Sequence, residues 1–140
     1  MLIPESNKEL NFSVAFGLLG LGIIYIAKNR FMHYHSQAVS LKWDEIGKDM
    51  QLLILALMKT VGGGFIAVAV AIVLLQLKFY LEKISWIPLL ILVMGLIIYL
   101  ASIYAQIQVR RNTPGNPPIT ISFLGIVMLI AAYIFNILSL

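Results

Sequence analysis

Long apolar runs separated by short polar segments are the main feature of this chain. Four runs have about the length of a membrane-spanning helix, over residues 12–27, 52–77, 86–106 and 119–138. A helix needs about 20 apolar residues to cross the hydrocarbon core, and the connecting segments are too polar to lie in it. The pattern therefore predicts an all-α, polytopic membrane protein whose residues 1–140 form one bundle of four transmembrane helices.

The segment between the first two spans predicts a different element. Residues 30–40, RFMHYHSQAVS, mix aromatic, apolar and polar side chains and are too polar to cross lipid. We expect a short segment that lies along the membrane interface, anchored by Phe31 and Tyr34. Ser40 is expected to be the N-cap of the helix that follows.

The longest helical pattern begins at Trp43 and ends in the second span. Apolar and small residues recur there at steps of three and four, which predicts one continuous helix with a heptad seam. The seam consists of Trp43, Ile46, Met50, Leu53, Leu57, Thr60, Gly64, Ala67, Ala71 and Leu74. Its side chains are bulky before Lys59 and small after it. A neighbouring helix should therefore approach closely only after Lys59, which leaves a wider gap before it.

Small residues predict where the helices pack most closely. Glycine, alanine and serine let helix backbones approach each other in lipid, where the hydrophobic effect does not drive association. The expected packing positions lie in the second span and in the first: Gly62, Gly63, Gly64, Ala67 and Ala71, with Ser13 and Gly17.

Composition supports the membrane class. The 140 residues are 61% hydrophobic and 11% charged, whereas about a quarter of a soluble domain is charged. The net charge of +4 comes from basic residues near the ends of apolar runs, so we interpret it as membrane anchoring and expect no nucleic-acid partner. The absence of cysteine excludes disulfides, thiolate catalysis and cysteine metal sites.

The basic residues also predict an orientation. The first and third loops together carry Lys28, Arg30, Lys42, Lys48, Arg110 and Arg111, whereas the polar lead over residues 1–10 and the second loop carry Lys8, Lys78 and Lys83. Because loops rich in lysine and arginine stay in the cytoplasm, residues 28–50 and 107–118 are expected there, with both termini outside. We expect the bilayer to be a bacterial inner (plasma) membrane.

Two histidines form the one pattern that suggests a metal. In an extended backbone His33 and His35 would face the same way and could bind a divalent ion together. In a helix the two side chains would diverge by about 200°, which would separate the pair. We expect a structural role at the interface and no cofactor, with a divalent metal at these histidines as the alternative.

Polar side chains near one end of the bundle predict a small pocket. Tyr25, Lys59, Tyr104 and Gln106 all fall near the end that is expected to face the cytoplasm. An ionisable residue within a span is a candidate ligand-binding group, and the tyrosines and the amide would add hydrogen bonds. The competing interpretation is that Lys59 extends its ammonium to the interface while the others bond between helices.

The sequence contains no complete catalytic pattern. A nucleophile motif, a zinc-protease motif, a phosphate-binding glycine loop and paired carboxylates within the spans are all absent, so we name no catalytic residue. We expect a non-catalytic subunit or scaffold that forms a homo-oligomer or joins a larger membrane complex. The alternative is a membrane enzyme or binding protein for a small molecule, lipid or metal, with its site at the cytoplasmic mouth of the bundle.

Overall fold

The computed structural model describes residues 7–140, with side chains from Glu9 onward, and it confirms the all-helical prediction. Over these residues there is no strand, and the elements are α1 (Asn7–Ala27), α2 (His33–Val39), the 3-10 turn η1 (Trp43–Glu45), α3 (Lys48–Glu82), α4 (Ile87–Asn112) and α5 (Ile119–Leu138). The long helices α1, α3, α4 and α5 are apolar enough to span a membrane. The predicted polar lead up to residue 6 lies outside the described residues.

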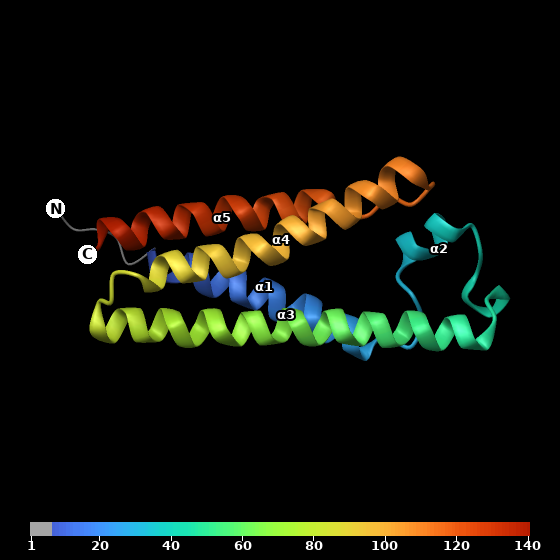
Figure 1. Ribbon diagram of the computed structural model, residues 1–140, viewed down its shortest axis with the longest axis horizontal. Helices are drawn as coiled ribbons and strands as arrows, with labels where there is room; N and C mark the ends of the chain where they lie inside the picture. The colour runs from blue at the N-terminus through green and yellow to red at the C-terminus, as the bar shows by residue number, and fades with distance from the viewer. Residues whose placement is uncertain (1–6) are drawn as a thin grey trace.

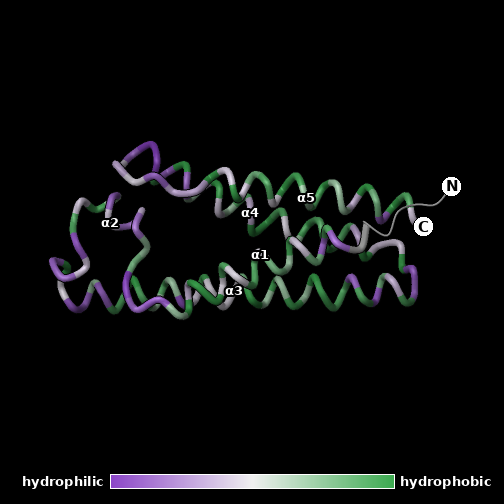
Figure 2. Tube along the Cα trace, turned by 180° about the vertical axis from the view of Figure 1, so that it is seen from behind, coloured by the Kyte–Doolittle hydropathy of each residue, from purple (hydrophilic) through white to green (hydrophobic). Residues whose placement is uncertain are grey.

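The four long helices form an elongated bundle. The α1 and α4 helices each pack against both α3 and α5 (Figure 1). At the end that holds the α3–α4 turn the helices lie together, and at the other end α4 and α5 tilt away from α3. Apolar residues cover the middle of the bundle and polar residues gather at its ends, most heavily around α2 (Figure 2). This distribution is the one that a bilayer requires of a polytopic protein.

Glycines allow the closest approaches between helices. A Cβ atom at Gly62 of α3 would lie 2.8 Å from the carbonyl oxygen of Gly22 of α1, and a Cβ atom at Gly22 would lie 2.7 Å from the carbonyl oxygen of Gly62. The backbones of α1 and α3 therefore touch at this point, as small residues permit in lipid. The contact joins Gly62, one of the predicted packing positions, to Gly22 of α1.

The α4–α5 pair packs by a reciprocal exchange of large and small residues. Leu129 of α5 occupies the space above Gly95 of α4, and Tyr99 of α4 occupies the space above Gly125 of α5. Each helix thus carries one glycine and, four residues later, one large side chain. Two antiparallel helices with this spacing interlock, which explains why Tyr99 and Leu129 are both buried.

Three buried amides connect three helices at the end that holds the α3–α4 turn, which we call the closed end. Asn11 of α1 donates from Nδ2 to Oε1 of Gln76 of α3 at 2.6 Å, and Asn136 of α5 donates from Nδ2 to the same oxygen at 3.1 Å. Gln76 returns a hydrogen bond from Nε2 to Oδ1 of Asn136 at 3.3 Å. All three side chains are fully buried, so this amide cluster ties α1, α3 and α5 together away from water.

The predicted seam of α3 has the right period but the wrong phase. The residues of α3 that are buried are Met58, Gly62, Phe65, Ala69, Ile72, Gln76 and Phe79, again at steps of four and three. The predicted seam lies mostly one or two residues before them, so Leu57 is 58% exposed and Gly64 and Ala67 face outward. Because α3 is apolar on every side, spacing alone does not select which face turns inward.

The predicted continuous helix from Trp43 is also wrong. The α3 helix begins at Lys48, after Gly47 and after an Ile46 with extended backbone. Glu45 accepts a hydrogen bond at Oε2 from the backbone N–H of Lys42 at 2.7 Å, which closes η1 as a separate turn. Ser40 ends α2 with a left-handed backbone (φ 55°) instead of capping the next helix.

Candidate ligand pocket at the α2 end

The pocket lies where the bundle opens. Beyond the Gly22–Gly62 contact α1 ends at Ala27, and the chain turns back through α2 into the space between α3 and the α4–α5 pair (Figure 1). The α3 helix has 35 residues and is about 52 Å long, against a hydrocarbon core of about 30 Å. It therefore extends past the core, and its residues 54–65 form one wall of the pocket.

Three contacts hold α2 in this opening. The hydroxyls of Tyr25 and Tyr34 form a hydrogen bond of 2.6 Å, which joins α1 to α2. The side-chain oxygen of Gln37 accepts the backbone N–H of Asn116 at 3.3 Å, which joins α2 to the α4–α5 loop. In that loop Gly115 lies against α2 so closely that a Cβ atom would be 3.0 Å from the carbonyl oxygen of Tyr34. The amphipathic segment is thus docked as a cover over the end of the bundle.

A cavity of about 430 Å³ remains between α2 and the long helices. This volume is within the range of pockets that hold drug-sized ligands. Its lining comes from the α2 segment (Phe31, Tyr34, His35, Ala38 and Val39), from α3 (Ile54, Leu57, Met58, Val61 and Phe65), from α1 (Tyr25) and from α4 (Ser102, Ala105 and Gln106). No charged side chain contributes to it among the described residues.

A smaller cavity of about 80 Å³ adjoins the first. The two cavities share Tyr25, Tyr34, Phe65, Ser102 and Gln106, so these side chains separate them. The smaller one continues toward α5, where Ser122 donates a hydrogen bond to Oε1 of Gln106 at 3.2 Å.

Burial favours the neutral form of two polar groups in the larger cavity. Burial, with the hydrogen bond to Tyr25, raises the pKa of the Tyr34 hydroxyl far above its ordinary value. Burial lowers the pKa of His35, whose ring packs edge-on against Phe31 and Tyr34. The Nδ1 atom of His35 accepts the backbone N–H of Met32 at 3.2 Å, so the hydrogen of the neutral ring is on Nε2.

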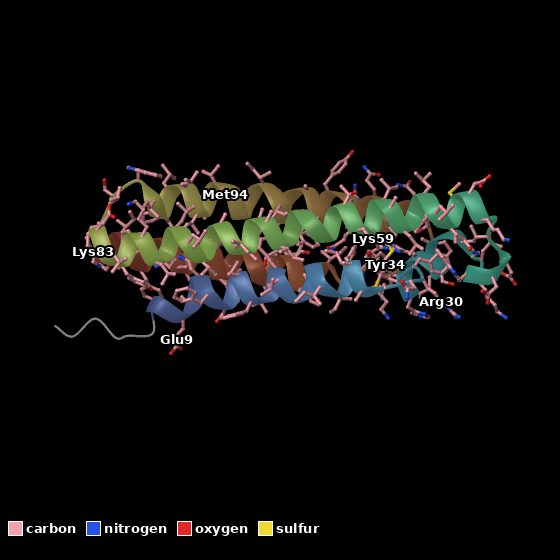
Figure 3. The ribbon with its side chains drawn as sticks, turned by 90° about the horizontal axis from the view of Figure 1, so that it is seen from below. Glu9, Arg30, Tyr34, Lys59, Lys83 and Met94 are labelled. Carbon is pink, nitrogen blue, oxygen red and sulfur yellow. The ribbon has the colours of Figure 1, made fainter. Side chains whose placement is uncertain are left out.

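The structure separates the four residues of the predicted pocket into two pairs. Tyr25 and Gln106 line the cavity, whereas Lys59 is exposed and Tyr104 is 67% exposed. Figure 3 shows Lys59 on α3 at the end of the bundle that also holds Tyr34. The neighbour of Lys59, Met58, is the buried residue, and successive side chains on a helix point about 100° apart. Lys59 therefore belongs to the surface of the pocket's wall and not to its interior.

The two histidines lie in a helix and face different surroundings. His33 is exposed, and its Nε2 is 3.2 Å from Nε2 of Gln37, whereas His35 turns into the pocket. The extended backbone that the metal interpretation requires is absent from α2. Among the described residues no three histidine, aspartate or glutamate side chains are grouped as metal ligands. The divalent metal stays a prediction without a converging ligand set.

Some of the predicted packing positions contact another helix and others do not. Gly62 is buried against α1, and Ala71 is partly buried. The other positions make no close helix contact within the described chain, because they are exposed or have open space where a Cβ atom would lie: Gly63, Gly64 and Gly17, with Ser13 and Ala67.

Sequence reasoning missed the inward face of α2. Phe31, Tyr34, His35 and Ala38 follow the spacing of one helical face, and this periodicity was the available signal. The polar residues of the segment exclude a membrane-spanning helix and favour a position at the membrane interface. They do not exclude a short helix that covers the end of a bundle.

Comparisons with protein-family models, with curated proteins and with solved structures found no match for this chain.

Proposed function

We propose that this protein binds a membrane-soluble, largely apolar small molecule in the pocket at the α2 end. The observation that carries the proposal is the cavity of about 430 Å³, whose walls are aliphatic and aromatic and whose few polar groups are uncharged. Ligand sites in proteins have this composition, since apolar walls supply affinity and a few polar groups fix orientation. This is the binding-protein interpretation of the sequence, without a catalytic step.

The rim of the pocket supports entry from the bilayer. Val39, Leu57, Val61 and Ala105 line the cavity and are also exposed on the outer surface. In a membrane protein, exposed aliphatic side chains on α3 and α4 face lipid tails or the interface. A ligand dissolved in the bilayer would thus reach the pocket without crossing water.

We further propose that the α2 end is cytoplasmic and that the bilayer is a bacterial inner membrane. The support is the excess of lysine and arginine in the loops at this end. Because the chain lacks cysteine, a Pro114→Cys variant gives a single reactive thiol in an exposed loop. An impermeant maleimide should label it in inverted vesicles and not in intact cells; the reverse result would refute this orientation.

Photolabelling tests the pocket. The probe is hexadecanol with a diazirine in its chain, incorporated in phosphatidylcholine vesicles that contain the protein. If the chain enters the pocket, peptides containing residues 31–39 should be labelled, although α2 is not one of the membrane-spanning helices. The Ala105→Phe variant should reduce this label several-fold by filling the cavity.

Ala101→Phe is the matched control. Ala101 is exposed on α4 one turn before Ala105 and does not line the cavity. Its phenylalanine should leave the α2 label unchanged. Equal labelling of α2 in the two variants, or none in the unmodified protein, would refute the binding function.

A scaffold that self-associates is the second candidate function. It is favoured by the open space beside Gly17 and Gly64, where a second copy or another membrane subunit could approach the backbone closely. A Gly64→Leu variant should then dissociate the oligomer in crosslinking experiments on native membranes. An unchanged crosslinking pattern, or a monomeric unmodified protein, would remove this candidate.

A further inference from the structure

The hydrogen-bonding groups in the pocket have hydrogens that no acceptor in the described structure uses. In the pair formed by Tyr25 and Tyr34 one hydroxyl donates to the other, so the accepting hydroxyl keeps a hydrogen of its own. The pair is part of the cavity wall, between the larger and the smaller cavity. It therefore offers one O–H donor to a bound molecule.

His35 offers a second donor. Its Nδ1 is an acceptor for the backbone N–H of Met32, which fixes the tautomer with the hydrogen on Nε2. Among the described residues no hydrogen bond uses that Nε2. The ring itself is held edge-on between Phe31 and Tyr34, so its direction is set before a ligand arrives.

Gln106 offers a third hydrogen-bond donor. Ser122 donates to the side-chain Oε1 of Gln106, which identifies the other amide atom as the Nε2 donor. This Nε2 makes no hydrogen bond in the described part of the chain. Because Gln106 lines both cavities, an acceptor in either one lies beside it.

No charged side chain lies beside these three donors in the described cavity lining. None of the described lining residues is lysine, arginine, aspartate or glutamate, and Lys59 on the adjacent surface is exposed. A phosphate or carboxylate buried here would have no cation to compensate its desolvation. Unused donors without a positive charge match a neutral acceptor.

We propose that the ligand of this pocket carries a neutral carbonyl group, held by the Tyr25–Tyr34 pair, His35 and Gln106 while its apolar part lies against α3. The inference rests on the proposed binding function and specifies its ligand class. Two membrane molecules have this chemistry: the ring of an isoprenoid quinone and the ester of a glycerolipid. Phe31 and Phe65 in the wall favour a flat ring.

Trp43 gives a built-in reporter for the test. Its ring is 5.0 Å from the ring of Phe31, which lines the pocket, and the other tryptophan, Trp86, lies beyond the opposite end of α3. In a Trp86→Phe background, quenching of Trp43 by decylubiquinone in vesicles reports binding near the pocket. A Trp43→Phe protein, which keeps Trp86, measures the quenching that comes from quinone dissolved in the bilayer.

Carbonyl recognition predicts a specific pattern. Quenching of Trp43 by decylubiquinone should saturate, and decylbenzene, which has the ring and chain without carbonyls, should reverse it only at a concentration at least tenfold above that of the quinone. The double variant Tyr25→Phe/Tyr34→Phe, which removes both hydroxyls of the pair, and Gln106→Leu should each weaken binding about five- to twentyfold. Tyr104→Phe, which removes an exposed hydroxyl from the same helix as Gln106, should leave it unchanged.

The failures are distinguishable from one another. If decylbenzene reverses the quenching at quinone-like concentrations, or if Tyr25→Phe/Tyr34→Phe and Gln106→Leu bind the quinone normally, the carbonyl inference is refuted while the apolar pocket stands. If the quinone gives no saturable quenching and the diazirine probe does not label α2, the binding function fails as well. Competition by monoolein at quinone-like concentrations would assign the lipid ester as the source of the carbonyl, and its absence would assign the quinone.

Discussion

The two ends of the bundle use their polar side chains in opposite ways. At the closed end the amides of Asn11, Gln76 and Asn136 bond to one another and are fully buried. At the α2 end Tyr25, Tyr34, His35 and Gln106 make some internal hydrogen bonds but keep donors free beside a cavity. At the closed end the shared hydrogen bonds fasten three helices, and only Oδ1 of Asn11 in this cluster is buried without a partner. At the α2 end the unused donors lie beside a cavity, where they leave chemistry for a ligand.

The packing of large side chains follows the same division. Phe79 and Ile87, near the α3–α4 turn, have no exposed surface, so the helices meet there without a gap. Past the Gly22–Gly62 contact the helices separate, and the short helix α2 fills only part of the space. One close backbone contact therefore marks the change from a packed core to an open pocket.

The largest effect is expected from breaking that contact. A Gly62→Leu variant would drive a side chain into the carbonyl oxygen of Gly22 and into the side chain of Tyr25. Because backbone atoms cannot move aside as a flexible side chain can, we expect a loss of about 3 kcal/mol or more in the free energy of unfolding. Equilibrium unfolding in mixed detergent–SDS micelles measures this loss.

Gly64→Leu is the control for this prediction. A Cβ atom at Gly64 would have no neighbouring atom within 4 Å, so the variant should unfold within about 1 kcal/mol of the unmodified protein. Similar destabilisation by both variants would mean that α1 and α3 do not meet at Gly22 and Gly62.

A smaller loss is expected from removing the centre of the amide cluster. Gln76→Leu would leave Asn11 without its acceptor and Asn136 without both of its hydrogen bonds to Gln76. Buried amides that lose their partners should reduce the free energy of unfolding by about 2 kcal/mol. The same SDS titration measures it, and binding at the α2 end should persist in the folded fraction.

Gln108→Leu provides the comparison for that variant. Gln108 is an exposed glutamine of α4, so its loss should change stability by less than about 0.5 kcal/mol. If Gln76→Leu were as stable as Gln108→Leu, the closed end would be held by apolar packing alone.

The smallest effect is expected from acidification at the α2 end. Burial lowers the pKa of His35 below the ordinary value of 6.5, so docked α2 binds a proton less readily than undocked α2. At pH values above 6.5 His35 is neutral in both states and does not affect the docking of α2. As the pH falls below 6.5, undocked α2 takes up the proton more readily, so docking weakens. In the Trp86→Phe background, emission of Trp43 should shift to longer wavelength as the pH is lowered from about 7.5 to about 5.

The exposed histidine separates this effect from general acidification. His33→Ala should retain the shift, because His33 is outside the pocket, and His35→Leu should lose it. A shift that survives in His35→Leu would assign the response to another group. The closed end, whose described helix contacts include no histidine, should show no unfolding over this range.

Much of the architecture follows from the sequence, and the pocket follows only in part. The positions of Tyr25 and Gln106 in their spans place both near one end, and both line the cavity. Lys59 stands out as a charge in an apolar run, yet exposure of its side chain is the cheaper arrangement for a cation. Tyr104 is close to Gln106 in the sequence, although residues two apart on a helix point about 200° away from each other.

The four apolar helices, their boundaries near polar turns and the heptad period of α3 can all be derived from the chain alone. These features depend on local composition and spacing, which a bilayer constrains strongly. Three features are decided only by the tertiary structure: the rotation of each helix about its axis, the pairing of Gly22 with Gly62, and the docking of α2 over the pocket. Lipid accepts every face of an apolar helix equally, so contacts between distant residues must select the face that turns inward.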